Sequence, residues 1–304
     1  MRIIELLVQA VLYFFTLSVV AVCSVPAFRP LLQYGKVLSP SNDSHTYLSL
    51  PSLLTKTVPK NWFLHFYITG FMSSLICIFV LILAKQERDA KLLRILACLD
   101  DTIVDFLSSW GVTTYTPCVS FPSSQYALSL FLLQCVRRWY ESKYVEKMST
   151  TARIRLGHYI VGQAFYICCA LAFAADGIAM AAINSYAEFD RQSLLAVFAG
   201  MILYLTSAYA QYNAHRQLAS LVKYSPPPAT KLFRYLVCPH YTAEILIYIS
   251  IPIVCGALTP GTTAVVVWTI VNLCASAEQS REFYTRRFGE SSVAGKWKVI
   301  PLFW

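Results

Sequence analysis

Long apolar runs dominate this sequence of 304 residues and restrict the folds that it can adopt. The first run, Leu6–Phe28, is long enough to cross a bilayer, because a spanning helix needs about 20 apolar residues. The further runs are Trp62–Ala84, Ser120–Val136, Leu156–Ala182, Ser193–Asn213 and Ala243–Ala277. Hydrophobic residues make up 57% of the chain and charged residues only 13%, which leaves too little polar surface for a soluble domain. The sequence therefore predicts an all-α integral membrane protein.

The last apolar run is interrupted by Thr259-Pro260-Gly261, a turn signal that predicts two short helices in its place. The prediction is then seven transmembrane helices. With this count, 19 of the 25 lysines and arginines fall on the side of the C-terminus and 6 on the other side. Because basic residues are enriched in cytosolic loops, we expect a cytosolic C-terminus and a lumenal N-terminus. We expect a single membrane domain over residues 1–304, with the first helix and a cytosolic loop in 1–60 and the core in 61–304.

Residues 85–116 combine charged side chains with apolar residues near helical spacing. This pattern predicts an amphipathic helix on the membrane surface opposite the cytosol. The net charge of +9 does not indicate a nucleic-acid partner, because the basic residues lie in short segments between the apolar runs. The 10 cysteines include no C-x-x-C pair, so neither a disulfide framework nor a metal site is expected from them.

Unusual polar residues recur at the predicted cytosolic ends of several helices. They are His65 and Tyr67 in the second span, Arg137, Arg138 and Glu141 in the third, Gln211, His215 and Arg216 in the fifth, His240 and Glu244 in the sixth, and Tyr284 and Arg287 after the seventh. Helices that converge in this way build a cavity with a cationic mouth and an apolar depth. We therefore expect a cytosolic-side cavity among helices 2–7, suited to an anionic cofactor above a lipid substrate. No G-x-G-x-x-G or P-loop is present, so side chains must hold any nucleotide.

Most of these residues also have a purely structural interpretation. Arg137 and Arg138 with Glu141 could form an ion-paired cluster at the membrane edge, and His215 could be an interface anchor. The pair His240 and Glu244 is the hardest to explain in this way, because four residues place both on one helix face and a carboxylate near a membrane is costly. His215, His240 and Glu244 lack the spacing of metal-binding motifs, and we expect no metal.

Five segments that contain these residues resemble the steroid 5-alpha-reductase superfamily, and within it the branch that reduces polyprenols or polyprenals. They are Val58–Tyr67, Leu133–Ser142, Gln211–His215, Cys238–Tyr248 and Trp297–Trp304. The resemblance implies a seven-helix reductase of the endoplasmic reticulum that uses NADPH to saturate the alpha-isoprene unit of a long polyprenoid, during dolichol synthesis for protein N-glycosylation. Residues 200–304 would be the C-terminal part that the superfamily shares.

The resemblance also implies where NADPH binds. The implied cofactor-binding residues are Gln211, His215, His240, Glu244, Tyr284, Arg287 and Lys298, with Arg137 and Arg138 as phosphate partners. Steroid-reducing members carry Asn and Asp at the positions of Gln211 and His215, and Asn at His240. Their catalytic Glu and Tyr align with Phe66 and near Arg138, so the substrate-activating acid does not transfer. His65 or Tyr67 would take this role, and His240 is the third candidate catalytic residue.

The chemistry of hydride addition distinguishes the possible substrates. Hydride adds readily to an electron-poor carbon, and the conjugated aldehyde of a polyprenal offers one, whereas the allylic alcohol of a polyprenol does not. A hydrogen-bond donor at the aldehyde oxygen would stabilise the enolate charge that develops. The alternatives are a 3-oxo-steroid 5-alpha-reductase, an isoprenylcysteine-type membrane methyltransferase, and a non-enzymatic lipid carrier. The sequence does not determine the oligomeric state.

Overall fold

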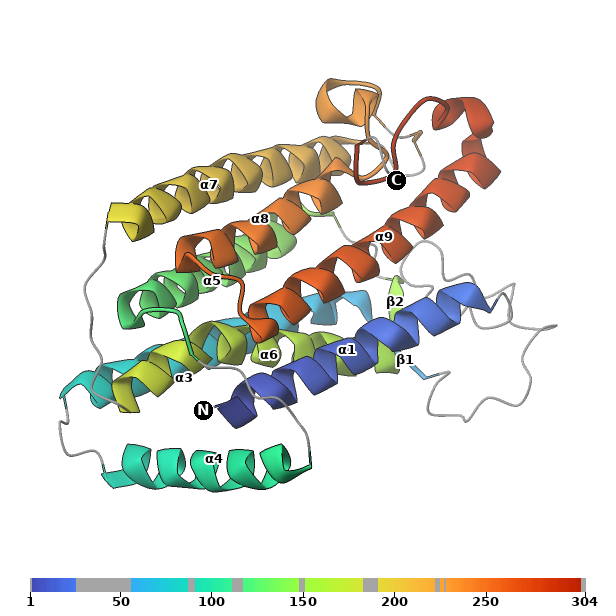
Figure 1. Cartoon of the computed structure of the whole chain (residues 1–304). Helices are drawn as coiled ribbons and strands as arrows, with labels where there is room; N and C mark the ends of the chain where they lie inside the picture. Colours follow the sequence, from blue (N-terminus) through green and yellow to red (C-terminus); the bar gives the residue numbers. More distant parts are fainter. Residues whose placement is uncertain are drawn as a thin grey trace.

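A computed structural model describes residues 2–25, 56–86, 91–110, 117–147, 151–182, 191–221, 225–226 and 228–301. Within these ranges the chain is mostly helical (Figure 1). The helices are α1 (Arg2–Ser24), α3 (Phe63–Gln86), α4 (Lys91–Ser109), α5 (Phe121–Tyr140), α6 (Leu156–Ala182), α7 (Arg191–Ser220), α8 (Pro239–Cys255) and α9 (Pro260–Phe288). The predicted cytosolic loop in residues 26–55 and the last residues of the Trp297–Trp304 segment lie outside the described residues.

Five stretches of the described helices are long and apolar enough to cross a membrane. They are Arg2–Ser24, Lys60–Lys85, Leu156–Ala181, Leu194–Ser220 and Pro260–Phe288. Helices α5 and α8 form where two further spans were predicted, but α8 has only 17 residues and α5 carries two arginines in its last turn. The multi-pass membrane architecture is thus confirmed, whereas the count of seven spans stays a prediction.

The break between α8 and α9 confirms the predicted turn and has a local cause. Gly256 ends α8 in the left-handed conformation with φ 71°, which a residue without Cβ adopts at little cost. Thr259 then caps α9, since its hydroxyl accepts the Thr262 amide at 3.1 Å and Pro260 occupies the first turn. The two helices can therefore pack against each other as neighbours.

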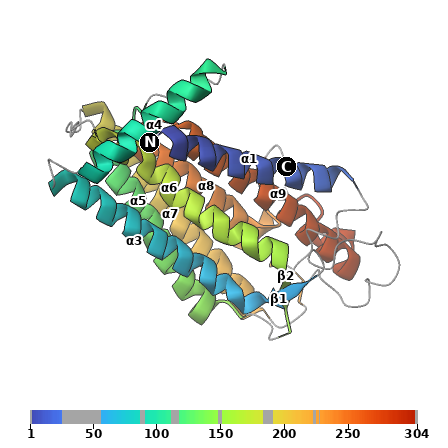
Figure 2. The same cartoon turned by 90° about the horizontal axis from the view of Figure 1, so that it is seen from below.

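Helix α6 lies in the interior of the bundle and packs against α1, α3, α5 and α9 (Figure 2). In the most apolar stretch of α6, 67% of the residues are buried, whereas the corresponding share in α1, at the edge of the bundle, is 22%. Phe131, Tyr166 and Phe173 form an aromatic contact between α5 and α6, with ring centroids 6.0 and 5.4 Å from Phe131. Helix α8 packs against α5, α7 and α9 and so joins α7 to the rest of the bundle.

Two short strands were not predicted. β1 (Thr57–Pro59) and β2 (Arg153–Arg155) pair antiparallel, with Thr57 opposite Arg155 and Pro59 opposite Arg153. β2 runs directly into α6, and β1 is separated from α3 only by a 3-10 turn, Lys60–Trp62, so the pair holds the starts of these helices together (Figure 1). Three-residue strands give no recognisable alternation of side chains, which is why a prediction from the sequence pattern missed them.

Four helices extend beyond their predicted bounds on the side of the polar cluster, and α5 does so by continuing from Val136 to Tyr140. α7 continues from Asn213 to Ser220, α9 continues from Ala277 to Phe288, and α8 begins at Pro239 rather than at Ala243. The predicted bounds followed hydropathy, but polar residues such as those after Asn213 continue a helix as readily as apolar ones. As a result, Tyr284, which was placed after the seventh span, is a helical residue, as are His215 and His240.

The predicted amphipathic helix forms as α4, which crosses the bundle near the N-terminus (Figure 2). Asp100 is buried and accepts hydrogen bonds from the backbone amides of Arg2 and Ile3, at 2.9 and 3.0 Å. This carboxylate satisfies two amides at the start of α1, which have no partner within that helix. Phe106 of α4 and Trp110, which follows this helix, are exposed.

Candidate active site

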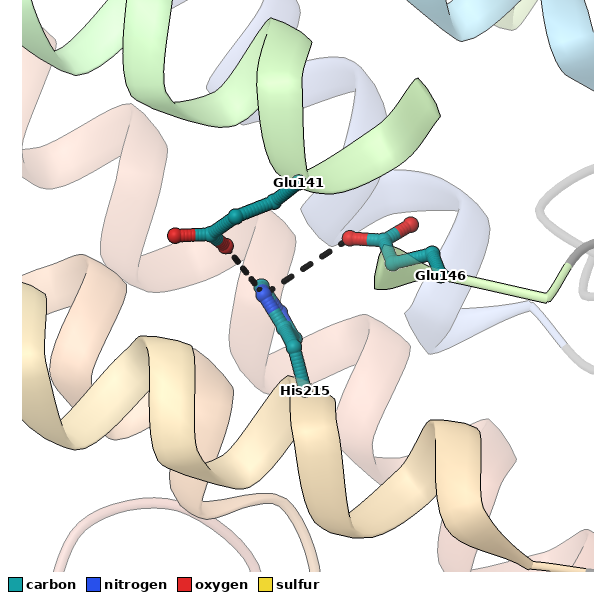
Figure 3. A group of neighbouring side chains, drawn as sticks. All are labelled: Glu141, Glu146 and His215. Atoms are coloured by element: carbon teal, nitrogen blue, oxygen red, sulfur yellow. Dashed lines mark hydrogen bonds and ion pairs between the residues drawn. The ribbon is translucent and has the colours of Figure 1, made fainter. Parts of the chain in front are cut away.

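The guanidinium of Arg138, in the last turn of α5, is the centre of a buried polar cluster. Its Nη1 donates to Glu141 Oε2 at 2.7 Å and to Glu146 Oε1 at 2.9 Å. Its Nη2 donates to the hydroxyl oxygen of Tyr67, on α3, at 3.1 Å. His215, on α7, places Nδ1 2.6 Å from Glu141 Oε2 and 2.8 Å from Arg138 Nη1 (Figure 3). Residues from three helices and a turn therefore meet at one guanidinium.

The tautomer of His215 follows from the donors around it. Arg138 has only donors, so His215 Nδ1 can accept from Arg138 or donate to Glu141, but it cannot do both. The contact with the carboxylate is the shorter one, at 2.6 Å. We therefore assign the ring proton to Nδ1, with Glu141 as its acceptor.

Arg137 and Gln211 extend the cluster to α8. Arg137 donates to Glu141, to Gln134 Oε1 at 2.8 Å and to Gln211. The amide nitrogen of Gln211 in turn donates to Glu244 and, at 3.4 Å, to the backbone carbonyl of His240. The expected convergence of polar helix ends is therefore present for α3, α5, α7 and α8.

Local structure at the end of α5 places both carboxylates on the same guanidinium. The spacing of three and four residues brings Glu141 to Arg138 and Arg137 in an ordinary helix. The chain then forms a π-helical turn, Glu141–Val145, before it leaves the helix at Glu146. Such wide turns are rare and occur often at functional sites. Here the turn brings Glu146 back to Arg138, eight residues away in sequence.

Burial makes this cluster costly to disturb. The side chain of Glu141 is fully buried, and those of His215 and Arg138 are 6% and 10% exposed. Breaking a buried ion pair by removing one partner costs about 3–5 kcal/mol, because the other charge is left uncompensated. Burial alone would raise the pKa of Glu146, but Arg138 and His215 hold the pKa of this carboxyl below its usual range. Glu146 is therefore ionised at neutral pH.

The charges of the cluster bear on the predicted phosphate partners. Arg137 and Arg138 face three carboxylates, those of Glu141, Glu146 and Glu244. Both guanidinium groups therefore already have anionic partners within the chain. A phosphate would have to compete with these carboxylates for either arginine.

His65 and Tyr67 lie on different faces of α3, because two residues correspond to about 200° of rotation in a helix. Tyr67 is buried and faces the cluster, where the Arg138 guanidinium carbon lies 5.4 Å from its ring centre. His65 is exposed instead, and its Nδ1 lies 3.0 Å from the hydroxyl of Tyr159 on α6. The structure therefore brings Tyr67, but not His65, to Arg138.

The C-terminal segment joins the start of α8. The amides of Val237 and Cys238 donate to the carbonyls of Trp297 and Lys298, at 2.8 and 3.1 Å. Lys298 forms an ion pair with Glu278 of α9. Tyr284 is buried in an apolar cluster that includes Val237, Cys238 and Val299. Arg287 is exposed near the end of α9. Tyr284 and Lys298 therefore lie near the start of α8 rather than at Arg138.

Glu146 was missed from the sequence. It follows the predicted span in a segment rich in charged residues, where nothing in the pattern separates it from a solvated glutamate. Only the π-helical turn brings it to Arg138. Gln134 was also not singled out, although it lies three residues before Arg137 on the same helix face and its spacing could have indicated the contact.

Comparisons with known proteins identify the family of this chain. A family model described as 3-oxo-5-alpha-steroid 4-dehydrogenase matches residues 158–304. The polyprenal reductase of Saccharomyces cerevisiae is 27% identical over 98% of this chain and 97% of its own length. The polyprenal reductase of Caenorhabditis elegans is 30% identical over 78% of this chain and 74% of its own length. This chain belongs to the polyprenal reductase family.

Membership of the polyprenal reductase family confirms the resemblance that was read from the five segments. The polyprenal reductase of Xenopus tropicalis, 26% identical over 88% of this chain, shows that the likeness is not confined to one group of organisms. The steroid dehydrogenase model begins at residue 158, so it includes His215 and Glu244 but not Tyr67 and Arg138. The match to the Saccharomyces cerevisiae relative covers 98% of the chain and so extends beyond the part that the steroid model matches.

Proposed function

We propose that this protein is an NADPH-dependent polyprenal reductase, which converts polyprenal to dolichal in the synthesis of dolichol for protein N-glycosylation. Family membership supports the reaction class. The observation that carries the mechanism is the buried hydroxyl of Tyr67, whose oxygen accepts a hydrogen bond from Arg138. The proposed substrate is the aldehyde because its conjugation makes the beta carbon electron-poor.

Tyr67 is the proposed catalytic residue. Its oxygen accepts from Arg138 Nη2 at 3.1 Å, so its own hydrogen points elsewhere and can be donated to a substrate carbonyl. A positive charge behind a phenol strengthens this donation, because it stabilises negative charge that moves onto the phenol oxygen. Donation to the aldehyde oxygen would stabilise the enolate that forms as hydride reaches the beta carbon. A proton then adds to the alpha carbon and completes dolichal.

The residues around the head of α8 fit an anionic nicotinamide cofactor. NADPH, when bound, supplies the hydride for the beta carbon. Glu244 and His240 are only partly buried, and Gln211 links them by hydrogen bonds to the Glu244 carboxylate and the His240 carbonyl. We propose that these groups orient the nicotinamide amide. We propose that the basic side chains implied by the resemblance, among them Arg287 and Lys298, contact the phosphates, and Lys298 would then exchange its ion pair with Glu278 for a phosphate oxygen.

We further propose seven membrane spans, with α5 and α8 completing the five longer ones, in the endoplasmic reticulum membrane. The excess of basic residues on the side of the C-terminus supports a cytosolic C-terminus and a lumenal N-terminus. The catalytic cluster would then lie near the cytosolic surface, where NADPH is available, with the polyprenoid chain in the bilayer.

The test is NADPH oxidation by the purified protein in detergent, with polyprenal, polyprenol and a 3-oxo-4-ene steroid offered separately. We expect turnover of polyprenal alone, and its loss in His240→Ala. Equal turnover of polyprenol, without a separate dehydrogenase, would contradict the aldehyde argument. Turnover of the steroid would instead assign the protein to the steroid-reducing branch, and no turnover of any substrate would refute the reductase.

A further inference from the structure

Glu141, Glu146 and His215 have the composition of a metal site. One ligand atom from each lies within 4.8 Å of the others, and the three side chains point toward one another (Figure 3). Two carboxylates and an imidazole are ordinary ligands for a divalent cation. The three residues come from the end of α5, the residue after its π-helical turn, and α7.

The position of a cation among these ligands is already taken by Arg138. Its Nη1 lies 2.7 Å from Glu141 Oε2, 2.9 Å from Glu146 Oε1 and 2.8 Å from His215 Nδ1. A metal ion could not enter without displacing this buried guanidinium. The two carboxylates therefore hold a cationic side chain, and His215 donates to Glu141 and so orients it. We call Glu141, Glu146 and His215 the arginine cage.

We propose that the arginine cage holds Arg138 as a built-in cation whose second nitrogen orients the hydroxyl of Tyr67. Arg138, Glu141, Glu146 and His215 are then positioning residues for the reduction, and Tyr67 is the group that touches the substrate. This inference deepens the function proposed above and rests on it. In this arrangement the Arg138 guanidinium has the role that a metal ion could have. It polarises the Tyr67 hydroxyl, which in turn stabilises the enolate.

The geometry of a guanidinium explains why this position requires arginine. Nη1 points into the cage while Nη2, on the same rigid plane, reaches the Tyr67 oxygen at 3.1 Å. The planar group thus fixes the direction of the second hydrogen bond once the first nitrogen is held. A lysine ammonium is a point charge and cannot fill the cage and reach Tyr67 with two rigidly linked nitrogens. The cage also keeps Arg138 in place, because its departure would leave the buried carboxylate of Glu141 and the partly exposed one of Glu146 close together without the guanidinium between them.

Chemical rescue tests this inference. Arg138→Ala removes the guanidinium, and we expect kcat with polyprenal to fall about 100-fold, the effect of losing a donor that stabilises a developing oxyanion. Millimolar guanidinium should enter the emptied cage and raise the kcat of Arg138→Ala about tenfold or more. Methylammonium should leave this kcat unchanged. Arg138→Lys should remain as slow as Arg138→Ala. The control is Arg286→Ala, since this arginine forms an exposed ion pair with Glu282 at 2.8 Å, and its kcat should not change.

The double variant Arg138→Ala with Tyr67→Phe shows whether the cation acts through Tyr67. Guanidinium should not restore its kcat, although it should still raise its melting temperature by filling the cage. If guanidinium stabilises Arg138→Ala without restoring its kcat, the cage is only structural and the positioning role is overturned. If guanidinium has no effect on stability either, the cage itself is wrong.

Two further outcomes separate this inference from the proposed function. A wild-type protein that reduces no polyprenal refutes the proposed function and with it the positioning role, while the melting temperatures with guanidinium still decide whether the cage exists. Elemental analysis of the purified protein adds the metal alternative. One equivalent of a divalent metal that is lost in Glu146→Gln would overturn the built-in cation, and we expect none.

Discussion

Helices α7 and α8 approach each other closely at Gly200, and Gly200→Ala tests this contact. A Cβ at this position would lie 2.5 Å from Val254 Cγ2 and 2.8 Å from both Ser250 O and Val254 N. The last two are backbone atoms of α8, so no change of rotamer can remove the clash. The helices would have to separate by about 0.6 Å to restore a contact of 3.4 Å.

The expected loss of stability combines two opposing effects. Overpacking a well-packed contact costs about 1–3 kcal/mol. Alanine is favoured over glycine inside a helix by up to about 1 kcal/mol, which offsets part of this cost. The net loss is then about 1–2 kcal/mol, which lowers the melting temperature of a chain of this size by roughly 3 °C. Because α7 carries Gln211 and α8 carries Glu244, the separation should also weaken their hydrogen bond and reduce kcat.

Gly157→Ala is the matched control, because nothing lies within 4 Å of a Cβ at Gly157, in the first turn of α6. Its melting temperature should stay the same or rise slightly. Both are measured by thermal unfolding in one detergent, followed by size-exclusion chromatography of the heated samples. Equal melting temperatures for the two variants would refute the close packing of α7 on α8.

Three other substitutions test separate parts of the structure. Tyr67→Phe should reduce kcat with polyprenal about 100-fold and leave KM nearly unchanged, because the lost donor acts mainly in the transition state; an unchanged kcat would exclude Tyr67 as the donor. The pKa of Glu146 lies below its usual range, so the charge of this carboxylate stabilises the fold. The stabilisation is complete above the ordinary glutamate pKa of about 4.3 and is lost as the pH falls through the lowered pKa. The melting temperature of wild type should therefore exceed that of Glu146→Gln at neutral pH and approach it in acid, and a constant difference would count against the ionised carboxylate. Asp100→Ala removes the acceptor of the Arg2 and Ile3 amides and should cost about 1 kcal/mol of stability, as loss of a helix cap does, whereas the exposed Asp105→Ala should cost nothing measurable.

The helices could be predicted because their signals are local. Leu156–Ala182 was predicted with the bounds that α6 has, since hydropathy changes sharply at both ends. The turn at Thr259-Pro260-Gly261 was also found, because a capping threonine and a proline act within a few residues. The ends of α7 and α9 were placed too early, because polar residues that leave the apolar region continue the same helix.

The composition of the candidate site could be predicted, but its pairing could not. Arg138, His215 and Tyr67 were recognised as unusual polar residues at helix ends, and the structure brings all three together. The resemblance implied that Arg138 binds a phosphate. Three neighbouring carboxylates already compensate its charge, and a phosphate would have to compete with them. Such compensation involves residues up to 106 positions apart and leaves no periodic trace in the sequence.

The sequence by itself determined that this chain forms a bundle of membrane helices, because the hydrophobic effect and backbone hydrogen bonding act on each apolar run separately. It also determined which polar residues had to find partners, since unpaired charges are costly near a membrane. Only the tertiary structure decided which partner each one has. A π-helical turn, the packing of α3 on α5 and the packing of α7 on that turn bring Glu146, Tyr67 and His215 to Arg138, and these depend on how whole helices pack rather than on any local signal.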